Sequence, residues 1–133
     1  MADKLLLELV SPERLLVSAE ADMVVMPGSE GHFGVLAGHA PVISAVRPGV
    51  IEVHDEGKET ARIFITGGFA EVTEQGLTVL AEEAIPVAEM KRDDLEKRLK
   101  NAEEDLDDAE SDEAMHKVQA TIAQLSEMLK VVN

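Results

Sequence analysis

The feature that most restricts how this chain can fold is the segment 26–51, where turn-forming residues are concentrated. It holds five of the nine glycines and three of the five prolines of the chain. Glycine tolerates positive φ and proline fixes φ, so this density prescribes a series of turns. Short apolar runs at 33–36 and 42–46 separate the turns. The segment therefore predicts short strands joined by shaped loops, and the loops are the expected recognition elements.

The chain up to Pro86 has the pattern of a β-sheet domain. Its apolar runs are short and rich in β-branched residues, and glycines, prolines and polar turn residues separate them. This punctuation is typical of an antiparallel sandwich or barrel. In residues 51–54 and 63–66 every second side chain is aliphatic, so one side of each strand can face a core. We expect residues 55–58 to close a hairpin between these two strands.

After Pro86 the pattern is that of two helices. This part lacks Gly and Pro, and its apolar residues recur at alternating spacings of three and four, as in helices that pack along a heptad-like stripe. Ser111 is expected to cap the second helix, and the short connection makes the helices antiparallel neighbours. The predicted seam consists of Leu95, Leu99, Ala102, Leu106 and Ala109 in the first helix and Met115, Val118, Ile122, Leu125, Leu129 and Val132 in the second.

We therefore predict an α+β, mainly β, chain of two domains: an antiparallel β-sandwich over 1–86 and a helical hairpin over 87–133. The core is expected to be aliphatic, because the chain has three Phe and neither Tyr nor Trp. The hairpin is expected to be weakly held, since the small alanine side chains in its seam bury little area. We expect it to dock on the sandwich, on a partner, or on both in alternation.

Composition argues against several classes of function. A net charge of −15 repels phosphate backbones and anionic lipid headgroups, so no nucleic-acid partner is expected. The absence of Cys rules out disulfides and thiolate metal sites. No apolar run approaches the roughly 18 residues that span a bilayer, and the N-terminus lacks the pattern of a signal peptide. We expect a cytoplasmic chain without direct membrane insertion.

The histidines do not have the spacing of a metal site. None of the four belongs to an H-x-x-x-H pair, so no metal ligand is predicted. His39 lies in a glycine-rich loop, and we expect its side chain to fix that loop through a hydrogen bond. The carboxylates of 105–108 resemble a calcium loop only faintly, because the glycine of its sixth position is missing. A solvated helix end is expected there instead.

No motif for catalysis or cofactor binding is visible in the sequence. Gly28, Gly31 and Gly34 have a spacing of three, and no G-K-[ST] follows them, so they do not form a phosphate-binding loop. The serines lack the context of a nucleophile elbow. We predict no catalytic residue and no cofactor, and we do not expect the chain to be an enzyme.

Several motifs carry a family resemblance. The segments 27–31, 38–41 and 48–51 occur in this order, followed by 67–72 and 79–84. In this order and spacing they resemble the epsilon-subunit family of bacterial F-type ATP synthases, the counterpart of the mitochondrial delta subunit. With the strand-rich first half and the helical second half, the resemblance covers nearly the whole chain.

The resemblance implies a ten-stranded antiparallel β-sandwich followed by a two-helix hairpin. It also implies a noncatalytic subunit of the rotor, which couples c-ring rotation to the gamma subunit and the catalytic head during proton-driven ATP synthesis. Gamma and the c-ring are the expected partners, and the C-terminal helices add the alpha/beta head as a candidate. The expected location is peripheral, on the cytoplasmic face of the bacterial inner membrane.

The resemblance also assigns roles to residues of the first domain. His32 occupies a position that is often acidic in relatives, and Glu30 can provide the charge instead. The residues expected to face the c-ring are Ser29, Glu30, His32, Phe33, His39, Ala40 and Pro41. The residues expected to shape the turns are Pro27, Gly28, Gly31, Gly34, Gly38, Pro48, Gly49, Gly67 and Gly68.

In some members of that family the helices inhibit ATP hydrolysis or bind ATP. Relatives that bind ATP begin the first helix with an I-D-x-x-R-A-like sequence and carry arginines on the second. Here the first helix begins with the residues 89–94, which lack that motif, and the second has only Lys117 and Lys130 as basic residues. We therefore predict no ATP binding and weak or absent inhibition.

The alternative hypothesis is a stand-alone regulatory or binding module. In that case the β-sandwich holds a ligand and the helices mediate dimerisation. The two hypotheses differ in whether a gamma-like partner exists.

Overall fold

The computed structural model describes residues 4–12 and 15–132. The chain divides into two units, Met1–Pro86 and Val87–Asn133. The first unit is built of strands and the second of helices.

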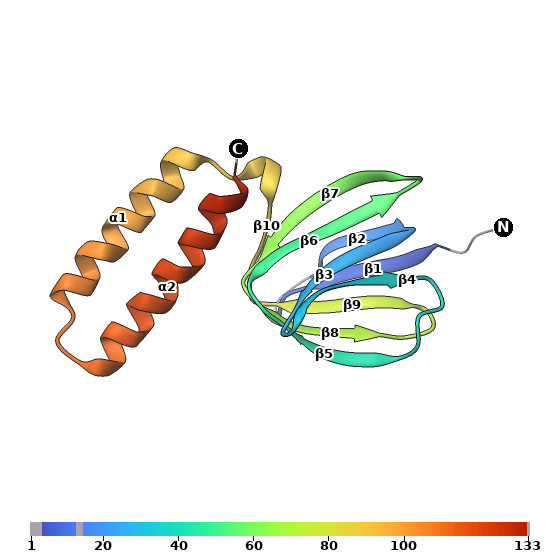
Figure 1. Ribbon diagram of the computed structural model, residues 1–133, viewed down its shortest axis with the longest axis horizontal. Helices are drawn as coiled ribbons and strands as arrows, with labels where there is room; N and C mark the ends of the chain where they lie inside the picture. The colour runs from blue at the N-terminus through green and yellow to red at the C-terminus, as the bar shows by residue number, and fades with distance from the viewer. Residues whose placement is uncertain (1–3, 13–14, 133) are drawn as a thin grey trace. The chain divides into compact units, whose positions relative to one another are not determined.

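Within the described residues, the first unit has ten strands, drawn as arrows in Figure 1. They are short because glycine, proline or small polar residues follow most of them. The strands are β1 (Leu5–Val10), β2 (Leu15–Ala21), β3 (Met23–Gly28), β4 (Gly31–Leu36), β5 (Val42–Val46), β6 (Gly49–Asp55), β7 (Lys58–Ile65), β8 (Gly68–Val72), β9 (Gly76–Ala81) and β10 (Ala84–Pro86).

These strands form one sheet that folds into a nearly closed sandwich. Their order is β10-β7-β6-β3-β5-β8-β9-β1-β2, and β4 pairs with β3 beside this path. The predicted ten-stranded β-sandwich is thus confirmed. One neighbouring pair departs from the antiparallel pattern, because β1 runs parallel to β9, with Leu7 beside Leu77 and Leu9 beside Val79. A parallel pair needs a long connection, and here most of the unit lies between the two strands.

The core of the sandwich follows from the alternation of its strands. In β1, Leu5, Leu7 and Leu9 are buried and the residues between them face outward. The expectation of an aliphatic core holds for this cluster, and Phe64 is buried outside it. Burial of each large side chain contributes about 1.5–3 kcal/mol. The buried cluster comprises Leu5, Leu7, Leu9, Ala21, Val24, Met26, Val35, Val46, Ile51, Val53, Ile63, Ile65, Ala70, Val72, Leu77, Val79 and Ala81.

The hairpin predicted at 55–58 is present between β6 and β7. Its two turn residues, Glu56 and Gly57, have φ of 54° and 78°. Two consecutive positive φ values define the type I′ turn that suits the twist of a hairpin. Gly57 adopts this conformation freely, whereas Glu56 does so at some cost.

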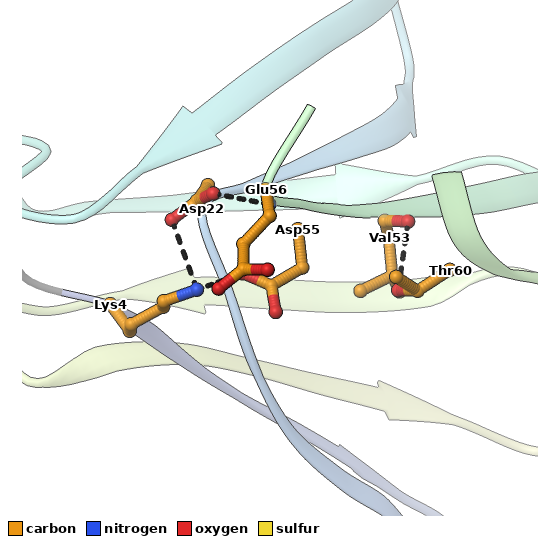
Figure 2. A network of polar contacts seen from close by, with 6 residues as sticks. All are labelled: Lys4, Asp22, Val53, Asp55, Glu56 and Thr60. Atoms are coloured by element: carbon orange, nitrogen blue, oxygen red, sulfur yellow. Dashed lines mark hydrogen bonds and ion pairs between the residues drawn. The ribbon is translucent and has the colours of Figure 1, made fainter. Parts of the chain in front are cut away.

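A network of polar contacts joins this turn to the start of β1 and to the connection between β2 and β3 (Figure 2). The Lys4 ammonium bonds to Asp55 and lies 3.5 Å from Asp22 Oδ1. The backbone N–H of Glu56 donates to Asp22 Oδ2 over 2.6 Å. The hydrogen bond from Lys4 to Asp55 raises the pKa of Lys4, and the Glu56 N–H lowers the pKa of Asp22. The network therefore fastens three segments that are distant in sequence.

The pairing of β6 with β7 contains a β-bulge. Val53 lies opposite Ala61, but His54 lies opposite Glu59, so Thr60 is an extra residue on β7. The Thr60 hydroxyl donates to the carbonyl oxygen of Val53 over 3.2 Å (Figure 2). Because of the bulge, Lys58 and Glu59 pair with β6 residues one position away from those that they would face in a regular ladder.

The second unit begins with a short 3₁₀ turn, Val87–Glu89, and continues with α1 (Arg92–Asp108) and α2 (Asp112–Val131). The predicted cap is confirmed, because the N–H of Ala114 donates to Ser111 Oγ over 3.1 Å. The carboxylates of 105–108 lie on the last turn of α1 and are exposed, which agrees with a solvated helix end.

The two helices pack along part of the predicted seam. Leu95, Ala102, Leu125 and Val132 are buried, and so is Met128, which the predicted stripe omitted. Met115 was placed in the seam, but its side chain is 39% exposed. The remaining seam residues, Leu99, Leu106, Ala109, Val118, Ile122 and Leu129, are half-buried. The hairpin is thus held by fewer buried side chains than the sandwich.

Arg92 adds a polar contact between the two helices. Its Nη2 donates to the carbonyl oxygens of Leu129 and Val132, over 3.4 Å and 3.2 Å. A cation at the carbonyl end of a helix is favourable. Within the described residues, neither helix is long and apolar enough to cross a membrane.

Candidate functional site

The hairpin of β3 and β4 carries the first group of predicted contact residues. Its turn consists of Ser29 and Glu30, and Gly28 pairs with Gly31 across it. A Cβ on Gly28 would lie 2.8 Å from the carbonyl oxygen of Gly31 and equally close to the Phe33 ring. Glycine at position 28 therefore allows the turn to close beneath Phe33.

An open hollow of about 260 Å³ lies at this turn. It brings together four of the predicted residues, and Glu30 and His32 among them are exposed. Ser44 also lines it, although no sequence signal indicated this residue, because only the pairing of β3 with β5 brings it close. The hollow is lined by Gly28, Ser29, Glu30, Gly31, His32, Phe33 and Ser44.

The loop between β4 and β5 carries the second group, His39, Ala40 and Pro41. Gly38 has φ of 79°, and the N–H of His39 donates to the carbonyl oxygen of Leu36 over 3.1 Å. The His39 ring also donates through Nδ1 to the carbonyl oxygen of Ala40 over 2.7 Å. The hydrogen bond expected from His39 is thus present, while Ala40 and Pro41 are exposed.

The structure does not bring the two groups into one pocket. The turn of Ser29 and Glu30 precedes β4, and the loop with His39 follows it. An extended strand of this length separates them by roughly 17 Å. Within the described part of the chain β4 pairs only with β3, so its other edge is free. We call the residues 29–41 the β4 edge, a linear surface rather than an enclosed site.

Most of the predicted turn residues lie in or beside connections, but one does not. Gly34 is in the middle of β4, opposite Val25, so its expected role in a turn is wrong. Gly68 begins β8, and a Cβ on it would lie 1.9 Å from the carbonyl oxygen of Leu80. Gly38, Pro48 and Gly67 lie in connecting segments, and Pro27, Gly28, Gly31 and Gly49 lie in strands within a residue or two of a turn.

A row of apolar side chains crosses the outer face of the sheet. Phe69 lies opposite both Ala45 and Leu80, and Val10 lies between Leu80 and Leu15 in the pairing of β9, β1 and β2. Phe69 is 59% exposed and Leu15 53%. We call Ala45, Phe69, Leu80, Val10 and Leu15 the apolar row.

The sequence alone did not indicate the apolar row. Phe69 and Leu80 occupy outward positions of their strands, which the alternation with buried Ala70 and Val79 indicates. Their alignment, however, depends on the register of five strands, and no local pattern specifies it. Contiguous exposed apolar surface of this kind is typical of protein interfaces.

Next to the apolar row, the same face is more polar. Glu71 lies opposite Thr78, and Thr78 lies beside Glu8 of β1. Among the described residues no buried side chain is polar or charged. The apolar row and the β4 edge are the candidate docking surfaces of the first unit.

Comparisons with known proteins agree with this architecture. The family model described as ATP synthase, Delta/Epsilon chain, beta-sandwich domain matches residues 4–87. The ATP synthase epsilon chain of Paramagnetospirillum magneticum is 61% identical over 112 residues, which is 84% of each chain. That of Parvibaculum lavamentivorans is 50% identical over 132 residues, covering 99% of this chain and all of its relative.

Solved structures show the same fold. In the cryo-EM structure of the Euglena gracilis mitochondrial ATP synthase, OSCP/F1/c-ring in rotational state 1, one chain superposes with a TM-score of 0.78 at 25% identity. The match covers 94% of this chain and 79% of that one. A chain of the Tetrahymena thermophila ATP synthase central stalk and c-ring superposes with a TM-score of 0.71 at 12% identity, covering 99% and 98%.

Proposed function

The chain belongs to the delta/epsilon chain family of ATP synthases, and on that premise we propose that it is a noncatalytic subunit of the rotor. In this role it couples rotation of the c-ring to the gamma subunit and the catalytic head. It lies on the cytoplasmic face of the inner membrane, as a peripheral part of the complex. The bond-making steps take place in other subunits.

The observation that carries this proposal is that two candidate docking surfaces lie on one well-packed unit. A coupling element must hold two partners at once and must not deform between them. The apolar row lies on β5, β8, β9, β1 and β2, whereas the β4 edge extends from β3. Both surfaces border the buried aliphatic cluster, which contains Val35 of β4 and Ala70 of β8, and close-packed interiors transmit strain.

Gamma is the partner proposed for the apolar row. A permanent contact within a rotor favours apolar burial, because such interfaces resemble a protein core. Phe69, Leu80 and Leu15 are the large side chains of the row, and each contributes on the order of 1.5–3 kcal/mol when fully buried. The C-terminal helices reach the alpha/beta head only as a secondary contact.

The c-ring is the partner proposed for the β4 edge. Ser29, Glu30, His32 and Phe33 lie at one end of it, and His39, Ala40 and Pro41 lie at the other. Glu30 is exposed, so it can pair with a basic loop of the ring. A linear surface of this kind suits a contact that spans more than one copy of a ring subunit.

A capture experiment tests the assignment of gamma. The double variant Phe69→Glu/Leu80→Glu places two charges in the apolar row and is expected to abolish capture of gamma by the full chain. The matched control is Glu71→Gln/Thr78→Ala, which changes the neighbouring cross-strand pair and is expected to retain capture. Undiminished capture by the first variant, with its fold intact by circular dichroism, would contradict the proposal.

The β4 edge is tested in reconstituted complexes. Glu30→Lys is expected to weaken ATP-driven proton pumping while leaving capture of gamma unchanged. Complexes that assemble and stay coupled without the chain would overturn the rotor role altogether. A chain that dimerises through its helices and captures no gamma would instead support a stand-alone module.

The hairpin is proposed to have little regulatory strength and no ATP site. Its second helix offers a triphosphate only Lys117 and Lys130, and eight carboxylates crowd the residues 103–113. Titration of the full chain with ATP is expected to show no binding in the submillimolar range. Deletion of 87–133 is expected to leave the ATPase rate of the assembled complex nearly unchanged, and a large rise would contradict this.

A further inference from the structure

Three side chains with metal-binding atoms gather on β6 and β7. They are Glu52, His54 and Glu59, and their ligand atoms all lie within 4.8 Å of one another. His54 Nε2 is 3.1 Å from Glu52 Oε1. The side chains of Glu52 and His54 are only 35% and 26% exposed, so the strands already restrict where they point.

The β-bulge explains why Glu59 belongs to this group. Glu52 and His54 are two apart on β6, so they share its outer face. In a regular ladder Thr60 would oppose His54, but Thr60 is the extra residue and Glu59 takes that place. Bulges re-aim side chains in this way, and they are frequent beside functional sites. The bulge therefore puts a second carboxylate beside the imidazole.

We propose that Glu52, His54 and Glu59 form a binding site for a first-row divalent transition metal, of which Zn²⁺ is the type case. One imidazole nitrogen and two carboxylate oxygens are ligands that such ions accept, and three protein ligands leave a coordination position open to water. Bonds of about 2.0–2.2 Å require ligand atoms roughly 3.3 Å apart. The two glutamates therefore need to close by up to about 1.5 Å, which rotation of partly exposed side chains allows.

Arg62 limits the strength of this site. Its Nε lies 3.5 Å from Glu59 Oε1, and Glu52 is its cross-strand partner. The guanidinium competes with the metal ion for the Glu59 carboxylate and also repels the metal ion. Metal binding must therefore break the ion pair between Arg62 and Glu59. This competition provides a test in the opposite direction, because neutralising Arg62 should make binding tighter.

The site is tested by titrating the full chain, free of any affinity tag, with Zn²⁺ in a calorimeter. One ion per chain is expected to bind. His54→Ala and Glu59→Gln are each expected to weaken binding about tenfold or more, whereas Arg62→Gln strengthens it. Titration with Co²⁺ in place of Zn²⁺ provides a visible absorption band. The affinities measured from this band should rank the variants in the same order as the calorimetry.

Matched controls separate this site from general attraction to an acidic protein. Glu56→Gln removes a neighbouring carboxylate outside the cluster, and His116→Ala removes a histidine of α2. Both are expected to leave the affinity unchanged. Equal affinity in His54→Ala, with circular dichroism showing that it is folded, would overturn the site, and so would loss of binding in His116→Ala.

Discussion

The β-sandwich and the helical hairpin belong to one chain but are held together differently. In the sandwich, side chains such as Leu7, Leu9 and Ile51 are completely buried between strands that are distant in sequence. In the hairpin, the seam is formed by two helices that follow each other directly, and most of its residues are half-buried. This chain therefore joins a body with a well-filled core to an appendage with little core of its own.

The consequence for function follows from this difference. A unit that must transmit torque needs a core in which a displacement on one side is felt on the other. A unit with few buried side chains opens at low cost, which suits a segment that changes partners. We expect the first unit to determine the coupling and the second to adjust to its surroundings.

Removal of one leucine from each unit tests the contrast between the two cores most strongly. Leu9→Ala is expected to lower the free energy of unfolding by about 2–5 kcal/mol, because it leaves a cavity in a filled core. Leu106→Ala in the half-buried seam should cost on the order of 1 kcal/mol. Urea denaturation followed by circular dichroism gives both values, and equal costs would contradict the contrast between the units.

The cap of α2 tests how far the hairpin depends on local contacts. Ser111→Ala removes the acceptor for the Ala114 N–H and is expected to destabilise the hairpin by about 1 kcal/mol. Ser126→Ala, in the interior of the same helix, should be neutral or slightly stabilising, since Ala is the better helix former. Amide hydrogen exchange in α2 measures both. An unprotected hairpin in the wild type would show that even its helices form only on a partner.

The β6–β7 turn is a site at which the sandwich can be stabilised further. Glu56 has a positive φ, which Asn tolerates better than Glu. Glu56→Asn is therefore expected to raise the free energy of unfolding by about 0.5–1 kcal/mol. Glu56→Ala removes the same charge without easing the backbone, and it should bring no gain. Thermal unfolding distinguishes the two variants.

The smallest expected effect concerns pH and the network around Lys4. The pKa of Asp22 is lowered from 3.8, so its contribution is present above pH 3.8 and is lost as pH falls through the lowered value. The pKa of Lys4 is raised from 10.5, so its contribution is present below pH 10.5 and is lost as pH rises further. Both groups are exposed, so the effect is small.

Melting temperatures across the pH range test this. The difference between the wild type and Asp22→Asn is expected to be constant near neutral pH and to shrink in acid. Lys4→Met should show the corresponding loss in strong alkali. A difference that grows in acid would contradict the assignment.

How much of this structure the sequence predicts depends on how far apart along the chain the interacting residues are. The turn at 55–58 and the cap at Ser111 follow from a few adjacent residues, and both were predicted. The parallel pairing of β1 with β9 joins Leu9 to Val79, and no local pattern indicates it. Met128 is buried in place of Met115, which the heptad stripe alone did not indicate.

The same reasoning applies to the candidate surfaces. The glycines around Ser29 indicated a turn correctly, but Gly34 was misplaced because glycine also occurs where a strand passes close to a side chain such as Met23. The apolar row and the position of Glu59 both depend on strand register, one through five paired strands and the other through a single extra residue. Register is a property of the folded sheet, so local sequence patterns predict neither the apolar row nor the position of Glu59.

The place of β1 in the sheet has a consequence for synthesis of the chain on the ribosome. β1 is translated before the other described strands, yet one of its two neighbours, β9, is among the last of them to emerge. Until then the nascent chain exposes an unpaired strand edge on a strand that carries four leucines. The pairing of β1 with β9 can form only after nearly the whole first unit has been synthesised. Until then, β1 is open to capture by a chaperone or to pairing with another copy of the chain.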